Sequence, residues 1–170
     1  FLGEDTWYGS RLNISAETTQ HLTTTLNSPW SSGDMARVTG EIVSALDNPA
    51  ASPDHHIRLY FTDPAKQTIR YERSWDGKSR LRFDFAVPAG LLVDGQNILT
   101  IAGLPTSSLP SDTLYFDWFS VAYDRSFQVQ NNQLHFSGDV AGTWLFELHE
   151  VSANDLEVLE GQGRIITGSK

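Results

Sequence analysis

The sequence predicts an all-β protein, built as a sandwich or a barrel of antiparallel strands. Apolar and polar residues alternate over several short segments, which is the pattern of strands that bury one face. Clusters of Asn, Asp, Pro and Gly separate these segments, and such residues favour turns. No long segment keeps the apolar spacing of an amphipathic helix. Short strands separated by turns in this way are typical of β-sandwiches and barrels.

The segments expected to form strands follow one another from residue 22 to residue 167. The plainest is 81–87, where four apolar side chains alternate with polar ones. Residues 57–61 repeat this alternation, and 22–26 do so within a Thr-rich stretch, where β-branching favours strands. Further strands are expected at 37–45, 97–101, 114–123, 133–136 and 143–148. Weaker candidates are 68–72, 156–159 and 164–167.

A change of pattern after Arg125 predicts a boundary in the chain. Residues 1–125 carry the long, aromatic-rich strand candidates and are expected to form the sandwich. Residues 126–170 contain shorter, hairpin-like candidates, so we expect either the last strands of that sandwich or a small β-appendage of the same domain. The stretch 50–56, which ends in Asp54, His55 and His56, has the composition of an exposed loop.

The charge balance and the residue content exclude several functional classes. The chain has 170 residues, with 12 Lys plus Arg against 21 Asp plus Glu and a formal net charge of −9. Nucleic-acid binding relies on cationic surfaces, so nucleic acid is not expected as a partner. No run of apolar residues has the length of a membrane helix, so membrane insertion is not expected. Cys is absent, which removes disulfides and a Cys nucleophile from this chain.

The start of the chain is unlike that of a complete precursor. It opens Phe-Leu-Gly-Glu-Asp, without a Met and without the basic and apolar regions of a signal peptide. We therefore expect this sequence to be part of a longer polypeptide.

Two stretches resemble known β-sandwich families. The stretch 87–101, Val-Pro-Ala-Gly-Leu-Leu-Val-Asp-Gly-Gln-Asn-Ile-Leu-Thr-Ile, is similar to the strand–turn–strand of galactose-binding-like jelly rolls. The second stretch is 112–123, Asp-Thr-Leu-Tyr-Phe-Asp-Trp-Phe-Ser-Val-Ala-Tyr. Together with the opening Glu-Asp-Thr-Trp-Tyr and the later segments 133–136 and 142–146, it resembles the β-sandwich that precedes the catalytic domain of gingipain-like secreted cysteine peptidases. This resemblance covers nearly the whole chain.

The resemblance implies an antiparallel β-sandwich of the galactose-binding-like jelly-roll type with a short C-terminal β extension. It also implies a non-catalytic accessory domain of a secreted, extracellular bacterial peptidase. Such a domain would pack against a neighbouring catalytic domain of the same polypeptide or present substrate to it. No catalytic residue is carried over, because the family's His and Cys belong to the catalytic domain and this chain has no Cys. Enzymatic activity is therefore not expected of this chain.

Aromatic residues near turns support an alternative function, that of a carbohydrate-binding module with glycan as its ligand. An exposed aromatic ring can stack on the apolar face of a sugar. Trp30 and Trp75 are both flanked by turn residues, so we expect them to be exposed. Trp7 and Tyr8 complete the candidate ligand-binding set. Trp118 lies within a strong strand pattern and is expected in the core.

Acidic residues far apart in the chain predict a structural calcium ion. Jelly-roll sugar-binding modules often hold this ion with one acidic residue of the first strand and one of the last, and Glu4, Asp5 and Asp117 resemble that pairing. Calcium takes several carboxylate and carbonyl oxygens as ligands. Asp117 is equally suited to cap a turn or to pair with an arginine. The adjacent His55 and His56 are interpreted as an incidental surface pair.

An independent glycan-active enzyme is a third hypothesis. Glycoside hydrolysis uses two carboxyl groups, and Glu4 with Asp5 or Glu147 with Glu150 would supply such a pair. In a chain with 21 acidic residues, most pairs of this kind are solvated surface groups. The sequence contains neither a Gly-x-Ser-x-Gly nucleophile motif nor a phosphate-binding glycine loop.

Overall fold

A computed structural model describes residues 9–49, 52–63, 65–106, 111–128 and 133–134, and the backbone of 158–160 and 164–166. The chain forms two compact units, Phe1–Arg125 and Ser126–Lys170. None of the described segments contains a helix with the length and apolarity needed to cross a membrane.

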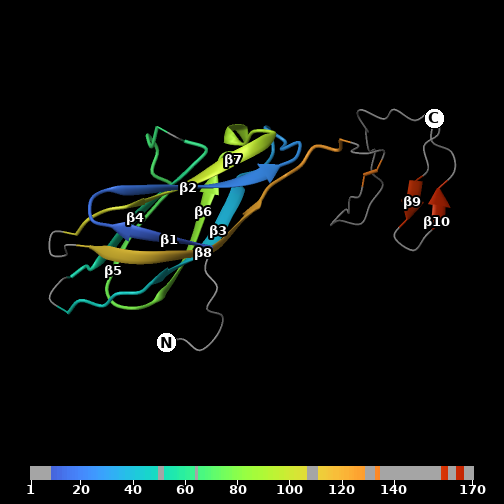
Figure 1. The fold of residues 1–170 in the computed structure, drawn as a ribbon. Helices are drawn as coiled ribbons and strands as arrows, with labels where there is room; N and C mark the ends of the chain where they lie inside the picture. The colour runs from blue at the N-terminus through green and yellow to red at the C-terminus, as the bar shows by residue number, and fades with distance from the viewer. Residues whose placement is uncertain are drawn as a thin grey trace. The chain divides into compact units, whose positions relative to one another are not determined.

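The first unit is a sandwich of two four-stranded sheets (Figure 1). One sheet has the order β1-β8-β3-β6, with β1 at Ser10–Ile14, β8 at Asp112–Ala122, β3 at Ala36–Ser44 and β6 at Arg80–Val87. The other has the order β2-β7-β4-β5, with β2 at Thr18–Leu26, β7 at Gly95–Gly103, β4 at His55–Phe61 and β5 at Tyr71–Trp75. A short 3-10 helix, η1 at Ala89–Leu91, lies between β6 and β7.

The strands pair as in a jelly roll. β1 pairs with β8, β2 with β7, β3 with β6 and β4 with β5, all antiparallel. The chain therefore resembles one long two-stranded ribbon folded over on itself. Two further antiparallel pairs, β3 with β8 and β4 with β7, join this ribbon into the two sheets. The predicted antiparallel β-sandwich is confirmed, and its order is that of two interlocked Greek keys.

The core lies between the sheets and is filled by the inward-facing residues of each strand. Phe61 and Phe83 are among the largest fully buried side chains, and the rings of Phe83 and Phe85 lie 6.1 Å apart. Gly40 of β3 makes room for this packing. A Cβ at position 40 would lie 2.3 Å from Cζ of Phe83 and 2.4 Å from the backbone oxygen of Trp118. Only a residue without a side chain fits between them.

Most alternating segments form the strands that they predict. β2, β3, β4, β6, β7 and β8 confirm the clear predictions between residues 22 and 123, and β5 overlaps the weaker candidate 68–72. β1 has no counterpart among the predicted strands, because only Leu12 and Ile14 alternate within it.

The second unit contains two short strands in its described part. β9, Val158–Glu160, and β10, Arg164–Ile166, pair antiparallel in a sheet of their own, at two of the weaker candidates. The candidate 143–148 and part of 133–136 lie outside the described residues.

Candidate functional site

One end of the sandwich gathers exposed apolar side chains. It is formed by the loop 27–35, between β2 and β3, and by the connection 88–94, between β6 and β7, which includes η1. Its exposed large apolar side chains are Trp30, Met35, Leu91 and Val93. Trp30 is 53% exposed, as expected from the turn residues around it. We call this surface the Trp30 end.

Hydrogen bonds hold the Trp30 end in place. The backbone N–H of Ser28 donates to Oδ1 of Asp94 at 2.7 Å and links the two connections. The segment that follows β8 joins them, because the backbone N–H of Trp30 donates to the carbonyl oxygen of Asp124 at 2.9 Å. Oδ2 of Asp124 also accepts a hydrogen bond from the backbone N–H of Asp34 at 2.9 Å. The backbone around Trp30 is therefore fixed before any partner binds.

Trp75 does not belong to the Trp30 end and is not a loop residue. It is the last residue of β5 and is half-buried against the core. Its ring lies 4.9 Å from that of His55, and its Nε1 donates to Oγ of Ser44 at 3.3 Å. This placement corrects the expectation of an exposed position. The turn begins only after Trp75, so β5 carries the side chain back onto the sandwich.

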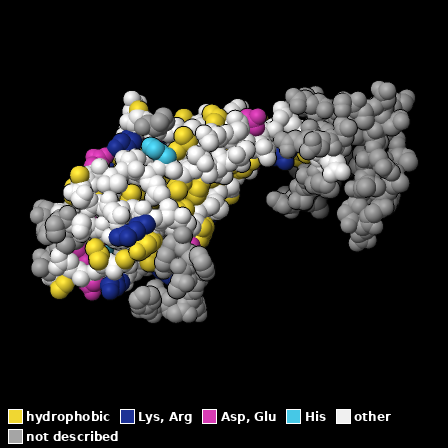
Figure 2. Space-filling model, in the orientation of Figure 1, with side chains coloured by type: hydrophobic (Ala, Val, Ile, Leu, Met, Phe, Trp, Pro, Cys, Tyr) yellow, Lys and Arg dark blue, Asp and Glu magenta, His cyan; other side chains and the backbone are white. Residues whose placement is uncertain are grey.

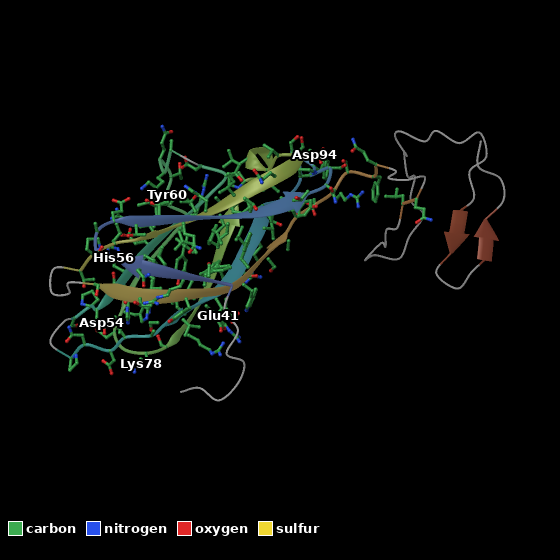
Figure 3. All side chains as sticks on the ribbon, in the orientation of Figure 1. Glu41, Asp54, His56, Tyr60, Lys78 and Asp94 are labelled. Carbon is green, nitrogen blue, oxygen red and sulfur yellow. The ribbon has the colours of Figure 1, made fainter. Side chains whose placement is uncertain are left out.

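Asp54 and His55 form a buried polar cluster at the other end of the sandwich, where Figure 3 labels Asp54. Asp54 and His55 are 1% and 0% exposed, so the expectation of an exposed loop over 50–56 is wrong for these two residues, whereas Ser52 and Pro53 are exposed. Nδ1 of His55 lies 3.0 Å from Oδ2 of Asp112, and Nε2 lies 3.1 Å from Oδ1 of Asp54. Asp54 also accepts a hydrogen bond from the backbone N–H of Gly77 at 3.0 Å.

The pKa of His55 is raised by its surroundings. Burial lowers this pKa, but the hydrogen bond to Asp112 and the charges of Asp112 and Asp54 outweigh burial. The carbonyl oxygens of Leu46 and Gly77 each lie 3.2 Å from Nε2 and accept from it when it carries a proton. No hydroxyl group of a described residue hydrogen-bonds to this ring. The arrangement favours the protonated form of His55 and leaves no side of the ring open to a substrate.

A β-bulge in β8 turns Trp118 to the outside of the β1-β8-β3-β6 sheet. Ile42 pairs with Phe116 whereas Glu41 pairs with Trp118, so Asp117 is an extra residue. The residues that pack in the core are Leu114 and Phe116 before the bulge and Phe119 and Val121 after it. Trp118 is 45% exposed, and the prediction that it lies in the core is wrong. A bulge re-aims side chains in this way.

Beside Trp118, the buried carboxylate of Glu41 holds two arginines. Glu41 is 3% exposed, and its Oε1 and Oε2 accept hydrogen bonds from Nη1 of Arg80 at 2.5 Å and from Nε of Arg82 at 3.1 Å. Burial raises the pKa of Glu41, but the two arginines outweigh burial and hold it below its ordinary value. Glu41 is therefore ionised at neutral pH and positions both guanidinium groups.

The predicted calcium ligands are only partly described. Asp117 stands at the bulge, where its Oδ2 lies 3.5 Å from Nη1 of Arg80, so a cation there would compete with an arginine. Glu4 and Asp5 lie outside the described residues, as do Trp7 and Tyr8 of the aromatic set and Glu147 and Glu150. Among the described residues, no group of three or more His, Asp or Glu side chains is placed to hold a metal ion. The calcium site stays a prediction.

The fold is similar to parts of other solved proteins, although no family model and no curated protein matches the chain. Dimeric latent PorU from Porphyromonas gingivalis matches with a TM-score of 0.51 and 12% identity over 74% of this chain and 11% of that chain. The insecticidal delta-endotoxin Cry8Ea1 from Bacillus thuringiensis matches with a TM-score of 0.44 and 13% identity over 69% and 20% of the two chains. TmCBM61, solved in complex with β-1,4-galactotriose, matches with a TM-score of 0.39 and 12% identity over 67% and 69%.

At these identities only the fold is shared. The match to PorU supports a β-sandwich, and the two matches with lower TM-scores are too weak to add to it. This chain spans 11% of the length of the PorU chain. Because one fold serves many unrelated functions, the activity of the whole protein does not follow from the similarity.

Proposed function

We propose that this chain is a non-catalytic accessory domain of a larger secreted bacterial peptidase similar to the gingipains. The Trp30 end would pack against a neighbouring catalytic domain of the same polypeptide. The group of exposed apolar side chains at this end carries the proposal, because such groups are typical of interaction surfaces. Pro29 within it forms a β-bridge with Arg125, the last residue of the first unit.

The pKa shifts of four described groups support a non-catalytic role. Hydrogen bonds from basic partners lower the pKa values of the exposed carboxylates Glu17, Glu72 and Asp84. A general acid needs the opposite shift, towards neutral pH. His55, the imidazole with a raised pKa, is enclosed by acceptors.

Hydroxyl-radical footprinting tests this proposal. The labelling of the 170-residue chain would be compared with that of the longer polypeptide purified from the culture medium of its source. Trp30 and Met35 should be labelled strongly in the isolated chain and protected in the longer polypeptide. Ile69, which is 44% exposed and lies outside the Trp30 end, is the internal control and should be labelled equally in both. Equal labelling of Trp30 in both, or a medium that contains no longer polypeptide, would contradict the proposal.

Glycan binding through Trp30 is a second candidate function. It is favoured by the exposed ring of Trp30 on a loop whose backbone is already fixed, because a pre-ordered loop loses little backbone entropy on binding. A glycan array would test it with the wild type and two variants. Trp30→Ala should abolish binding without loss of stability, whereas Trp75→Ala should lower stability because Trp75 packs against the core. An array without any bound glycan would reject this candidate.

A structural calcium ion belongs to this second candidate. Its ligands would be Asp117 together with Glu4 or Asp5. The glycan array repeated with a chelator tests this prediction. Glycan binding that is present without chelator and lost with it would show that binding requires the ion. Binding that is unchanged in chelator would remove calcium from the proposal.

A further inference from the structure

We infer that the outer face of the β1-β8-β3-β6 sheet is a binding site for an acidic oligosaccharide, centred on Trp118 and Arg82. This site is separate from the Trp30 end and rests on neither function proposed above. In Figure 2, hydrophobic side chains and Lys or Arg side chains lie next to one another over β1 and β8. An aromatic ring beside a guanidinium group is a combination suited to a sugar that carries a carboxylate.

The bulge supplies the aromatic part of the site. Without the extra residue Asp117, the alternation of β8 would direct position 118 into the core, as the buried Leu114 and Phe116 show. The bulge instead leaves Trp118 45% exposed in the middle of a polar sheet face. Bulges occur frequently beside binding and active sites, where they turn a side chain towards a ligand.

Arg82 supplies a fixed donor with its outer edge open. Its side chain is 83% exposed, yet its Nε is held by Oε2 of the buried Glu41 at 3.1 Å. No described residue accepts a hydrogen bond from its Nη1 or Nη2. These two nitrogens form a flat edge that binds a carboxylate through two parallel hydrogen bonds. Because Nε is already anchored, the guanidinium group needs little further ordering on binding.

The register of the sheet sets the distance between the two groups. Glu41 pairs with Trp118 on one side and with Arg82 on the other, so these residues lie two strand spacings apart, about 10 Å. A sugar ring stacked on Trp118 can therefore place the carboxylate of a neighbouring sugar at Arg82. In the next row of outward residues, the hydroxyl groups of Thr39 and Ser120 lie 2.9 Å apart and can bind sugar hydroxyls.

The charge of this face favours an anionic ligand. Its described charged side chains are Arg11, Arg37, Arg80, Arg82, Glu41, Asp84 and Asp117. Four arginines against three carboxylates leave a net charge of +1, in a chain with a net charge of −9. The net charge of −9 repels a nucleic acid, with its dense charge, more strongly than an oligosaccharide with isolated carboxylates, and the attraction of a carboxylated sugar comes from the arginines of this face.

Titration of the whole 170-residue chain tests the inference. Trigalacturonate is the acidic probe and galactotriose the neutral one, with binding followed by tryptophan fluorescence and calorimetry. The wild type should bind the acidic probe more tightly. Arg82→Gln should weaken this binding about tenfold or more, because it removes the paired hydrogen bonds to a charged group. Trp118→Ala should also weaken it, because it removes the ring on which the sugar stacks. Arg82→Lys should also weaken it, because an ammonium group lacks the paired donors.

Arg58→Gln is the matched control, because Arg58 lies on β4 of the other sheet and its Nε is held by Glu72 as that of Arg82 is held by Glu41. This variant should bind trigalacturonate like the wild type. Both Trp118 and Arg82 are exposed, so the variants should keep the circular dichroism spectrum of the wild type. Equal affinity for the two probes, no binding at millimolar concentration, or the same loss of binding in Arg58→Gln would overturn the inference. Tighter binding of a single-stranded DNA oligomer, lost in the same variants, would overturn it in favour of nucleic acid.

Discussion

Replacing Asp112 with Asn tests whether charge in the His55 cluster stabilises the sandwich. Asp112 is 5% exposed, and its Oδ2 lies 3.0 Å from Nδ1 of His55. Asn has nearly the same shape, so the substitution removes the charge and keeps the packing. Removing one partner of a buried ion pair costs about 3–5 kcal/mol. Because Asp54 remains 3.1 Å from Nε2 and His55 can lose its proton, we expect the lower end, about 3 kcal/mol of unfolding free energy.

The pH dependence of this loss separates charge from packing. Burial lowers the pKa of His55, but Asp112 and Asp54 raise it above its ordinary value, so the folded state binds the proton more tightly than the unfolded state. This stabilisation is fully present below the unfolded pKa of about 6.5 and is lost as pH rises through the folded pKa. Asp112→Asn removes most of the upward shift. The difference between wild type and variant should therefore be larger at about pH 5.5 than at about pH 9.

Urea unfolding followed by tryptophan fluorescence at both pH values measures these differences. Asp84→Asn is the matched control, because Asp84 pairs with Arg37 on the exposed face of the sheet. Exposed ion pairs contribute little to stability, so this variant should unfold like the wild type at both pH values. The reasoning would be refuted if Asp112→Asn cost as little as Asp84→Asn, or cost the same at both pH values.

Three further substitutions test the packing and the charges of the sandwich. Gly40→Ala should lower the melting temperature, because the added Cβ would lie 2.4 Å from the backbone oxygen of Trp118. Overpacking of this kind costs about 1–3 kcal/mol or more of unfolding free energy. Gly90→Ala is its control, with 3.6 Å of space, and equal melting of the two would contradict the prediction. Phe83→Ala should lower the unfolding free energy measured in urea by about 3–5 kcal/mol, because Phe83 is 1% exposed. A decrease no greater than that of a surface substitution would contradict its position in the core. Burial raises the pKa of Glu41, but the two arginines lower it by more, so its pKa in the folded state is below its ordinary value. The ionised Glu41 therefore stabilises the fold above its ordinary pKa, and this stabilisation is lost as pH falls through the pKa of the folded state. Glu41→Gln should therefore unfold more easily than the wild type at neutral pH and like it in strong acid, which urea titrations at both pH values check.

The strands were predictable because alternation is a local property of the chain. Each strand of a sandwich buries every second side chain, so the pattern is written into consecutive residues. In 57–61 and 83–87 the alternate apolar residues are buried as the pattern predicts. β1 is short and has only two buried apolar residues, so its position depends on pairing with β8. This pairing joins residues far apart in the chain, such as Asn13 and Thr113, which are separated by 100 positions.

The candidate site was predictable only in part. The exposure of Trp30 follows from the turn residues beside it, which are local signals. The predictions for Trp75 and Trp118 are wrong for different reasons: β5 continues as far as Trp75, where a turn was expected, and a bulge adds one residue to β8. The bulge reverses the face on which Trp118 lies, and neither feature is visible in the alternation of the sequence. For Arg82 and Glu41, the alternation indicated only that each side chain faces outward from its strand. It did not indicate that the two strands pair and bring these residues together.

By itself, the sequence determined that this chain is an antiparallel β-protein, which faces of most strands are buried, and that its surface is acidic. Only the tertiary structure decided the order of the strands, the outward position of Trp118 and the enclosure of Asp54 and His55. The physical reason is that alternation acts between neighbouring residues, whereas sheet pairing, register and the desolvation of a polar group depend on contacts between residues far apart in the chain. His55 illustrates this, because a residue typical of a loop is buried here beside the carboxylate of Asp112, which reaches it from β8.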